Sequence, residues 1–449
     1  MKKLVKITSF LLIVCLLAVV FVACGEDDSN GPVDTPSTHV DYVSELKLDM
    51  NSESLKLQVT VKNYVDGDTV HFNVPSNVSA NGVLKGRFLA IDTPESTGKI
   101  EDYGRKASAF TKEKLKSASS IIIESDTSKW NVDSTGDRYL VWVWYKPQGA
   151  SDYRNLNVEI LQNGLAIASK TANNRYGEIA MAALTQARAE KLYVHSGVKD
   201  PDMYYGEAIA VSMKDLRSSI DEYNNLKVAV EGVVVENYNS TAYVESFDEE
   251  TGVYYGISVY YGFNLSGTGL SILSIGNKVR IVGTVQYYET GGTWQISGVQ
   301  YREFVPDDPN NLQLISSGHT PAYTLVSADA FANGKVSFEH EEGDEIITKT
   351  YDLAELMLSA SISMENLKII SIYTTNNGGS SDGAMTFTCK ASDGTIVDVR
   401  TDPLYKSDKT PYTEADFNGK TISVKGIVDY FSGDYQIKVF APEDITIVG

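Results

Sequence analysis

Five residues within one short stretch combine the side chains that phosphate chemistry requires. Asp68 and Asp92 offer hard carboxylate oxygens, which suit Ca²⁺ or Mg²⁺ better than a soft metal, and the backbone carbonyl of Thr93 is a possible third ligand. Arg87 offers a guanidinium that binds two phosphate oxygens at once and keeps its charge, so it can offset the negative charge of a phosphodiester under attack. Glu95 can accept a proton from water. These residue types predict a divalent cation held beside a phosphate.

Each part of this stretch also has an ordinary structural explanation. Asp66-Gly67 between alternating apolar residues is typical of a hairpin turn. Thr93-Pro94-Glu95 fits the start of a helix, because proline suits the first helical position and acids suit the first turn. Alternation with period two would place Arg87 and Asp92 on opposite faces of one strand, so these side chains meet only if the strand bends or ends before Asp92.

The flanking sequence predicts the elements that would position these side chains. Alternating apolar residues predict five strands, over residues 55–61, 70–74, 88–91, 121–124 and 139–144. Apolar residues spaced by three and four predict three helices, over residues 102–117, 156–163 and 178–192. Because the strands come first and the helices lie at one end, we expect an α+β fold.

Four motifs in this region resemble the thermonuclease (staphylococcal nuclease) family. They lie at residues 65–95, 103–112, 136–144 and 157–166, and the whole resemblance covers about residues 57–199. It implies a small five-stranded barrel with three helices, itself OB-like. It also implies a Ca²⁺-dependent endonuclease that cuts DNA and RNA with little sequence preference.

The resemblance assigns the metal site to four residues. Asp68 and Asp92 correspond to the carboxylates that bind Ca²⁺ in that family, and the Thr93 carbonyl corresponds to a further ligand. Asp66 corresponds to a carboxylate that lies behind the metal ligands.

Three further residues correspond to the family's catalytic groups. Arg87 and Arg138 match the two arginines that clamp the scissile phosphate, and Glu95 matches the general base. The chain departs from the family pattern in two places, because Asp137 is an extra residue before Arg138 and Lys170 stands where the family has a base-stacking tyrosine. Since every catalytic residue type of the family is present, we do not expect a degenerate nuclease domain that only binds nucleic acid.

Residues 1–23 are typical of a bacterial lipoprotein signal peptide. A basic start precedes an apolar run over residues 10–22, and Phe21-Val22-Ala23-Cys24 resembles a lipobox with Cys24 as the lipidated residue. A transmembrane anchor is the alternative, but the run is short and acidic residues follow it. Residues 24–54 then form a polar, flexible tether. We therefore expect an extracytoplasmic protein of the cell envelope, anchored to a membrane by lipid.

Charge separates the chain into unlike parts. The 449 residues carry a formal net charge of −20. Residues 57–199 contain 18 Lys and Arg against 15 Asp and Glu, whereas residues 200–449 contain 16 against 36. Only the nuclease-like region is positive, as the approach to a polyanion requires.

The rest of the chain is mainly β and contains a faint internal repeat. Asn225-Leu-Lys-Val recurs as Asn366-Leu-Lys-Ile, Gly283-Thr-Val-Gln-Tyr-Tyr recurs as Gly426-Ile-Val-Asp-Tyr-Phe, and both copies end in Gln-Ile. Short alternating strands punctuated by glycine resemble OB-fold barrels.

These patterns divide the chain into domains. We expect a thermonuclease-like domain over residues 55–200, an OB-like domain over 205–305, a linker over 306–322 and a second OB-like domain over 323–449. The OB-like domains are expected to serve as spacers or to dock an unknown partner, because their region is strongly acidic. Binding of single-stranded nucleic acid on exposed tyrosines is the alternative, with Tyr260, Tyr261, Tyr287 and Tyr288 as candidates.

The sequence as a whole predicts an extracytoplasmic, Ca²⁺-dependent endonuclease that hydrolyses phosphodiester bonds of DNA and RNA. The alternative is a cell-surface lipoprotein that binds nucleic acid or acts as an adhesin without cleaving. The sequence contains no Gly-x-x-x-x-Gly-Lys-Ser/Thr loop, so a P-loop nucleotide hydrolase is excluded.

Overall fold

The structure is a computed structural model that describes residues 39–448 apart from 290 and 343–344. The expected signal peptide and the expected lipid-bearing Cys24 lie outside the described residues. Within the described residues, no helix is both long and apolar enough to cross a membrane.

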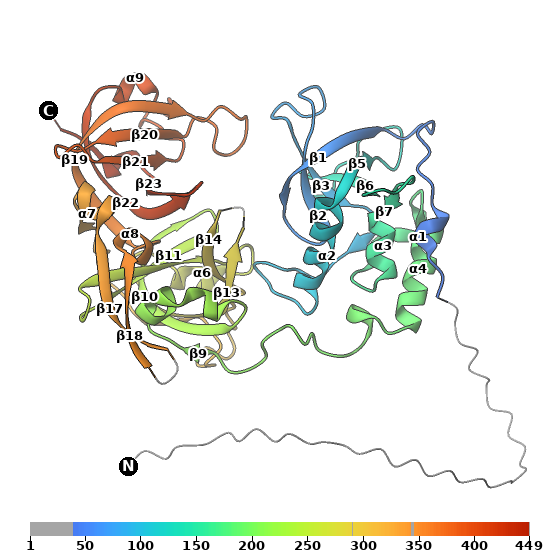
Figure 1. The fold of residues 1–449 in the computed structure, drawn as a ribbon, viewed down its shortest axis with the longest axis horizontal. Coiled ribbons are helices and arrows are strands. Elements are labelled where there is room, and N and C mark those ends of the chain that lie inside the picture. Colours follow the sequence, from blue (N-terminus) through green and yellow to red (C-terminus); the bar gives the residue numbers. More distant parts are fainter. Residues whose placement is uncertain (1–38, 290, 343–344, 449) are drawn as a thin grey trace, which may run out of the picture. The chain divides into compact units, whose positions relative to one another are not determined.

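A closed five-stranded barrel forms the N-terminal part of the described chain (Figure 1). Its strands are β1 (Lys56–Tyr64), β2 (Thr69–Asn73), β3 (Val83–Phe88), β5 (Ala118–Glu124) and β6 (Tyr139–Pro147). They pair in the order β3-β2-β1-β5-β6, and β6 closes the barrel by running parallel to β3. The expected strand over residues 88–91 was misplaced, because β3 ends at Phe88 and Ala90 has a φ of 70°.

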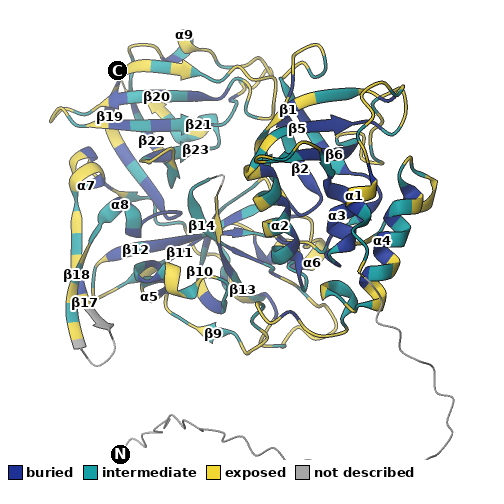
Figure 2. Cartoon of the chain, turned by 45° about the vertical axis from the view of Figure 1, so that its right-hand side comes forward, coloured by how far each residue is buried: buried dark blue, intermediate teal, exposed yellow. Residues whose placement is uncertain are grey.

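The three helices expected from the sequence accompany this barrel. They are α2 (Gly104–Lys116), α3 (Leu156–Gln162) and α4 (Gly177–Ala189). Every residue of α3 is buried, and the Asn155 side chain caps it by accepting from Val158 N at 3.1 Å. The strands supply most of the remaining core, and Figure 2 shows buried stretches along β5 and β6. Strand β6 contributes two buried tryptophans, Trp142 and Trp144.

A short helix lies near the end of the segment expected as a tether. It is α1 (Tyr42–Glu45), and its Val43 belongs to the core of the N-terminal barrel. Arg154 donates to both carboxylate oxygens of Asp41, at 3.2 and 3.3 Å, just before the helix. Residues 41–45 are therefore part of the folded domain.

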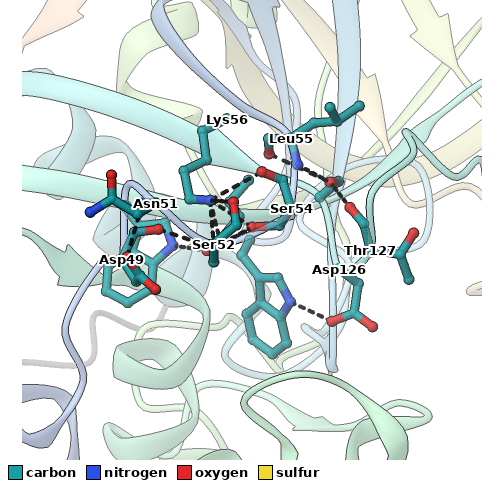
Figure 3. A network of polar contacts seen from close by, with 12 residues as sticks. Asp49, Asn51, Ser52, Ser54, Leu55, Lys56, Asp126 and Thr127 are labelled. Atoms are coloured by element: carbon teal, nitrogen blue, oxygen red, sulfur yellow. Dashed lines mark hydrogen bonds and ion pairs between the residues drawn. The ribbon is translucent and has the colours of Figure 1, made fainter.

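A buried carboxylate links this barrel to the segment before α4. Glu124 accepts from Ser54 Oγ at 2.5 Å, Trp144 Nε1 at 2.8 Å and Tyr176 OH at 2.9 Å. Lys56 lies 3.7 Å from the same carboxylate, and Figure 3 shows it beside Ser54, to which its Nζ donates at 2.8 Å. The charge of Glu124 is thus compensated in the interior, as a buried ion requires.

Two more barrels follow. The first C-terminal barrel contains β10 (Lys227–Tyr238), β11 (Thr241–Asp248), β12 (Val253–Tyr260), β13 (Lys278–Tyr288) and β14 (Thr293–Ser297). The second contains β19 (Ser361–Thr374), β20 (Met385–Lys390), β21 (Ile396–Thr401), β22 (Thr421–Phe431) and β23 (Asp434–Val439). Shorter elements connect or flank these barrels: α5 (Met213–Ser218), α7 (Ala328–Asn333), α8 (Leu353–Leu356) and the hairpin of β17 (Lys335–Glu342) and β18 (Glu345–Asp352).

All three barrels share one topology. Numbered within each barrel, the strands pair in the order 1-2-3-5-4, the fourth strand also pairs with the first, and the third runs parallel to the fifth. A helix stands between the third and fourth strands each time: α2, α6 (Gly267–Ile272) and α9 (Glu414–Phe417). This is the arrangement of an OB-fold, so the expected fold class is confirmed.

One part of the expected repeat was wrong. In the first C-terminal barrel Gly283 pairs with Val228, whereas in the second Gly426 pairs with Ile362. Asn366 therefore lies inside β19, whereas Asn225, its match in the first copy, precedes β10. Strand register depends on which face of the strand is buried and on β-bulges. A match of four residues between two sequences therefore does not determine the register.

The two C-terminal barrels share one hydrophobic core, whose buried side chains come from both. The buried carboxylate of Glu245 in β11 accepts from Ala322 N at 2.9 Å and from Ser361 N and Oγ at 2.8 Å each. Strand β15 (Gln313–Ser316), within the segment expected as a linker, pairs with β13. The two barrels are thus joined by packing as well as by the chain.

Candidate functional site

The structure brings three of the expected site residues together around one cation. The guanidinium of Arg87 forms ion pairs with Asp68 Oδ1 through Nη1 and with Asp92 Oδ1 through Nη2. Arg87 lies near the end of β3, directly opposite Thr69 of β2. Asp68 immediately precedes β2, so strand pairing places it beside Arg87.

Asp92 reaches the same point because the chain turns after β3. The strand ends at Phe88, the left-handed conformation of Ala90 reverses the chain, and Asp92 follows in β4 (Ile91–Asp92). The buried amide of Asn157 holds this turn by donating to Leu89 O at 2.9 Å. Strand β3 therefore ends before Asp92, which is the condition under which the side chains of Arg87 and Asp92 were expected to meet.

Asp68 is buried, with 1% of its surface exposed. Its Oδ2 accepts from the backbone N–H of Thr93 at 3.0 Å, and its Oδ1 accepts from Thr69 Oγ1 at 3.0 Å. Burial raises the pKa of this carboxyl, while the Arg87 charge and the Thr93 hydrogen bond oppose the increase. Its ionised form therefore depends on a cation beside it.

Close packing against α2 holds the Asp-Gly-Asp turn. A Cβ at Gly67 would lie 2.8 Å from Thr93 Oγ1 and 2.9 Å from Ala107 Cβ, so only glycine fits. Thr111 Oγ1 donates to Gly67 O at 2.5 Å. The turn is therefore fixed to a helix of the same barrel.

Asp66 and Glu95 form a second carboxyl pair. Asp66 is buried, and its carboxylate accepts from Gly67 N at 2.8 Å. Burial, followed by the hydrogen bond and the charge of Glu95, raises the pKa of Asp66 to about 8. Asp66 is thus largely protonated at neutral pH, and it lies against the predicted base.

The exposed Glu95 begins a loop that leads to α2. Its backbone N–H donates to Glu101 Oε2 at 3.1 Å, and Glu101 N donates back to Glu95 O at 3.0 Å. Gly104 closes the loop, because a Cβ there would lie 2.1 Å from Glu95 O. The loop is therefore a compact turn whose first residue carries the carboxylate.

Arg138 is held by a partner that sequence reasoning missed. Its Nε donates to Asp133 Oδ2 at 2.7 Å, and its Nη2 lies 2.7 Å from the same oxygen. The next residue, Tyr139, pairs with Gly86 beside Arg87, so the backbone brings both arginines to neighbouring strands. Asp137, the extra residue in this loop, pairs with Lys85 at 2.6 Å. Asp133 lies five residues before Arg138 in the same loop, and this short spacing was the signal in the sequence that could have predicted the ion pair.

The donors around Arg87 fit a hard divalent cation. Asp68 and Asp92 direct carboxylate oxygens at one positive group, and the buried Thr93 Oγ1 has no hydrogen-bond partner among the described residues. Within the described chain, no group of three or more His, Cys, Asp or Glu side chains is arranged to hold a metal. Here the guanidinium occupies the cationic position, so a metal ion and Arg87 would compete for the same oxygens.

The tyrosines proposed as stacking platforms differ in exposure. Tyr261 is buried in the core, and Tyr260 is half-buried. Tyr287 and Tyr288 are 47% and 45% exposed. At most two of the four therefore present a large open face.

A hollow of about 590 Å³ lies beside the Glu95 loop. Its walls are Pro94, Glu101, Asp102, Tyr103, Val194, Gly197, Val198 and Lys199. Neither Arg87 nor the two aspartates that bind it line this hollow, so the cluster and the hollow are separate features.

Residues 85–194 match the model of a protein family described as "Staphylococcal nuclease homologue". Arg87, Asp92, Glu95 and Arg138 lie inside the matched range, and Asp68 lies before its start.

Proposed function

We propose that this protein is a Ca²⁺-dependent endonuclease that hydrolyses phosphodiester bonds of both DNA and RNA, because residues 85–194 match the model of the staphylococcal nuclease homologues. The observation that supports this most is the placement of Arg87 between Asp68 and Asp92, with the Asp66–Glu95 pair close by in sequence. Such a cluster of ionisable side chains, one of them with a strongly raised pKa, is typical of a functional site and is not required for the stability of a barrel.

The two arginines act on the phosphate. Arg87 exchanges its carboxylate partners for a phosphate oxygen, and Arg138, oriented by Asp133, binds a second one. Because negative charge accumulates on these oxygens as the phosphorus is attacked, fixed guanidinium donors stabilise the transition state more than the ground state.

Glu95 handles the proton of the attacking water. It accepts that proton while the water oxygen bonds to phosphorus, and the bond from phosphorus to the 5′ oxygen breaks on the opposite side. The leaving oxygen takes a proton from solvent, so a 3′-phosphate and a 5′-hydroxyl result. The neighbouring Asp66 has a pKa of about 8, so the charge beside Glu95 changes near neutral pH and makes cleavage sensitive to pH.

Asp68, Asp92 and the Thr93 carbonyl would hold Ca²⁺ in the active protein. When bound, the ion supplies positive charge beside the phosphate. The protein's own contribution is to bury Asp68 and to hold it by the Thr93 N–H, so that the carboxylate keeps one orientation.

A plasmid-nicking assay on the full mature chain tests the activity. We expect nicking with Ca²⁺, none with EGTA, and parallel degradation of an unstructured RNA. Glu95→Gln should remove most of the cleavage while leaving DNA binding in a gel shift. Retarded DNA without nicking by the wild-type chain would instead support the alternative, a surface protein that binds nucleic acid or acts as an adhesin.

We also propose that the protein is extracytoplasmic and lipid-anchored, on the basis of the motif that ends at Cys24. Incorporation of a labelled fatty acid tests this directly. Wild-type protein should carry the label and fractionate with membranes, and Cys24→Ser should carry none. A mature wild-type protein that is released without label would contradict the anchor and leave the nuclease proposal intact.

A further inference from the structure

The loop that carries Glu95 is held from outside its own barrel. Gln286 in β13 of the first C-terminal barrel donates from Nε2 to Ser96 O at 3.0 Å. Both residues are buried, with 5% of Ser96 and 8% of Gln286 exposed. Ser96 directly follows Glu95, so a residue 190 positions away along the chain fixes the backbone beside the predicted base.

Two glycines lie where the loop meets the first C-terminal barrel, and the packing is tight at Gly298. A Cβ at Gly98 would lie 3.6 Å from Tyr260 Cε1, and a Cβ at Gly298 would lie 3.3 Å from Ile100 Cδ1. Lys112 of α2 also forms an ion pair with Glu289 at the end of β13. The contact therefore combines a hydrogen bond, apolar packing and opposite charges.

The same contact reaches the carboxyl pair of the site. The side chains of Ser96 and Glu95 both lie close enough to the Asp66 carboxyl to shift its pKa. Glu95 is also close enough to Tyr260 to contribute to the raised pKa of that phenol, after burial as the larger cause. Movement of the loop relative to its own barrel would therefore change how Glu95 lies against Asp66, which is held in the Asp-Gly-Asp turn.

The chemistry of Gln286 indicates a specific role. Its Oε1 is buried without a hydrogen-bond partner among the described residues, which costs free energy that an apolar side chain would avoid. Its counterpart in the second C-terminal barrel is Asp429, which bonds to Gln436 of its own barrel at 2.7 Å. The amide of Gln286 is thus directed out of its barrel, at the Glu95 loop.

We propose that the first C-terminal barrel positions the catalytic loop of the nuclease domain, and that Gln286 is the positioning residue, acting on Glu95 through Ser96. This inference rests on the proposed nuclease function. It gives the barrel a role in cleavage that does not involve binding nucleic acid. The contact with the Glu95 loop also covers part of Tyr260, one of the candidate stacking residues.

The test uses the full mature chain with Gln286→Met, which keeps the length of the side chain and removes its donor. The matched control is Gln295→Met, because Gln295 lies directly opposite Gln286 in β14 and donates within the barrel to Ser297 Oγ. We expect Gln286→Met to lower kcat roughly ten-fold, with little change in KM. A catalytic group misplaced by about 1 Å can cost about 10²-fold in rate, and we expect the shift of Glu95 to be smaller than that. Hydrogen exchange should become faster over residues 96–101 in this variant alone.

A double-mutant cycle with Glu95→Gln separates positioning from general stability. If Gln286 acts through Glu95, Gln286→Met lowers kcat in the wild-type background and has little effect in the Glu95→Gln background. The proposal is overturned by unchanged exchange over residues 96–101, by faster exchange with normal kcat, or by additive losses. If the wild-type chain does not cleave, the nuclease proposal fails, while the exchange measurement still decides whether Gln286 holds the loop.

Discussion

Arg87 forms an ion pair with Asp68, a buried carboxylate 19 residues earlier in the chain. The second arm of the guanidinium binds Asp92, so one cation neutralises two carboxylates that would otherwise repel each other. The arginine expected to bind phosphate and the aspartates expected to bind metal are therefore partners in this structure. Binding of Ca²⁺ would release Arg87 for the phosphate, which couples the two events.

Arg87→Ala should lower kcat by at least about 10²-fold, as for the loss of one preorganised donor to a transition state. Calorimetric Ca²⁺ affinity should not weaken, because the variant removes the cation that competes for Asp68 and Asp92. Arg154→Ala is the matched control, since Arg154 also pairs with two acids, Asp41 and Glu159, but outside the site. Near-normal kcat in Arg87→Ala would remove this arginine from the mechanism.

Arg138→Ala should also lower kcat by about 10²-fold. Asp133→Asn should cause a smaller loss, because the guanidinium remains but its ion pair is weakened. Single-turnover cleavage at saturating Ca²⁺ measures both variants. A larger loss in Asp133→Asn than in Arg138→Ala would mean that Asp133 acts by itself and does not serve to orient the arginine.

The raised pKa of Asp66 predicts how the stability of the metal-free chain depends on pH. Its folded pKa is about 8 against a usual value of 3.8, so between these values the folded state binds the extra proton. The contribution of Asp66 to the free energy of unfolding therefore decreases as pH rises from about 4 to about 8 and is constant above that. Asp66→Asn removes this dependence, so the variant should gain stability relative to wild type as pH rises.

Urea denaturation in EGTA at pH 5, 7 and 9 measures this difference for Asp66→Asn. Asp152→Asn is a control, because Asp152 is an exposed residue away from the site. Parallel stability curves for Asp66→Asn and wild type would contradict a raised pKa at this position.

Arg217→Met should leave the free energy of unfolding unchanged or raise it by about 1 to 4 kcal/mol. Arg217 of α5 is buried, its Nη2 donates to Glu355 O at 2.8 Å, and its Nε and Nη1 have no partner among the described residues. Burial lowers the pKa of this guanidinium to about 10, which reflects the cost of its charge. Arg302→Met, at an exposed arginine, is the control in urea denaturation. A marked loss of stability in Arg217→Met would show that the charge itself holds the barrels.

Several features of this protein follow from local sequence. The alternation around Val70 and Tyr139 predicts strands because it reports which side chains face a core, and the spacing in residues 156–163 predicts a helix for the same reason. The types of Arg87, Asp92 and Glu95 predict phosphate chemistry because each type has few chemical uses in such a combination. These inferences need only neighbouring residues, which the sequence supplies directly.

Other features depend on residues that are distant in the chain. Arg87 meets Asp92 only because β3 ends at Phe88, and the amide of Asn157, from another element, holds the turn that follows. Strand register was likewise undetermined, since it depends on bulges and on the burial of opposing faces, and a repeated tetrapeptide at Asn366 was misleading.

The contact between Gln286 and Ser96 illustrates the limit most clearly, because 190 residues separate them and no pattern in the sequence pairs them. Local patterns reveal what each segment buries but not which distant segment covers it. That choice is made by the packing of complete barrels.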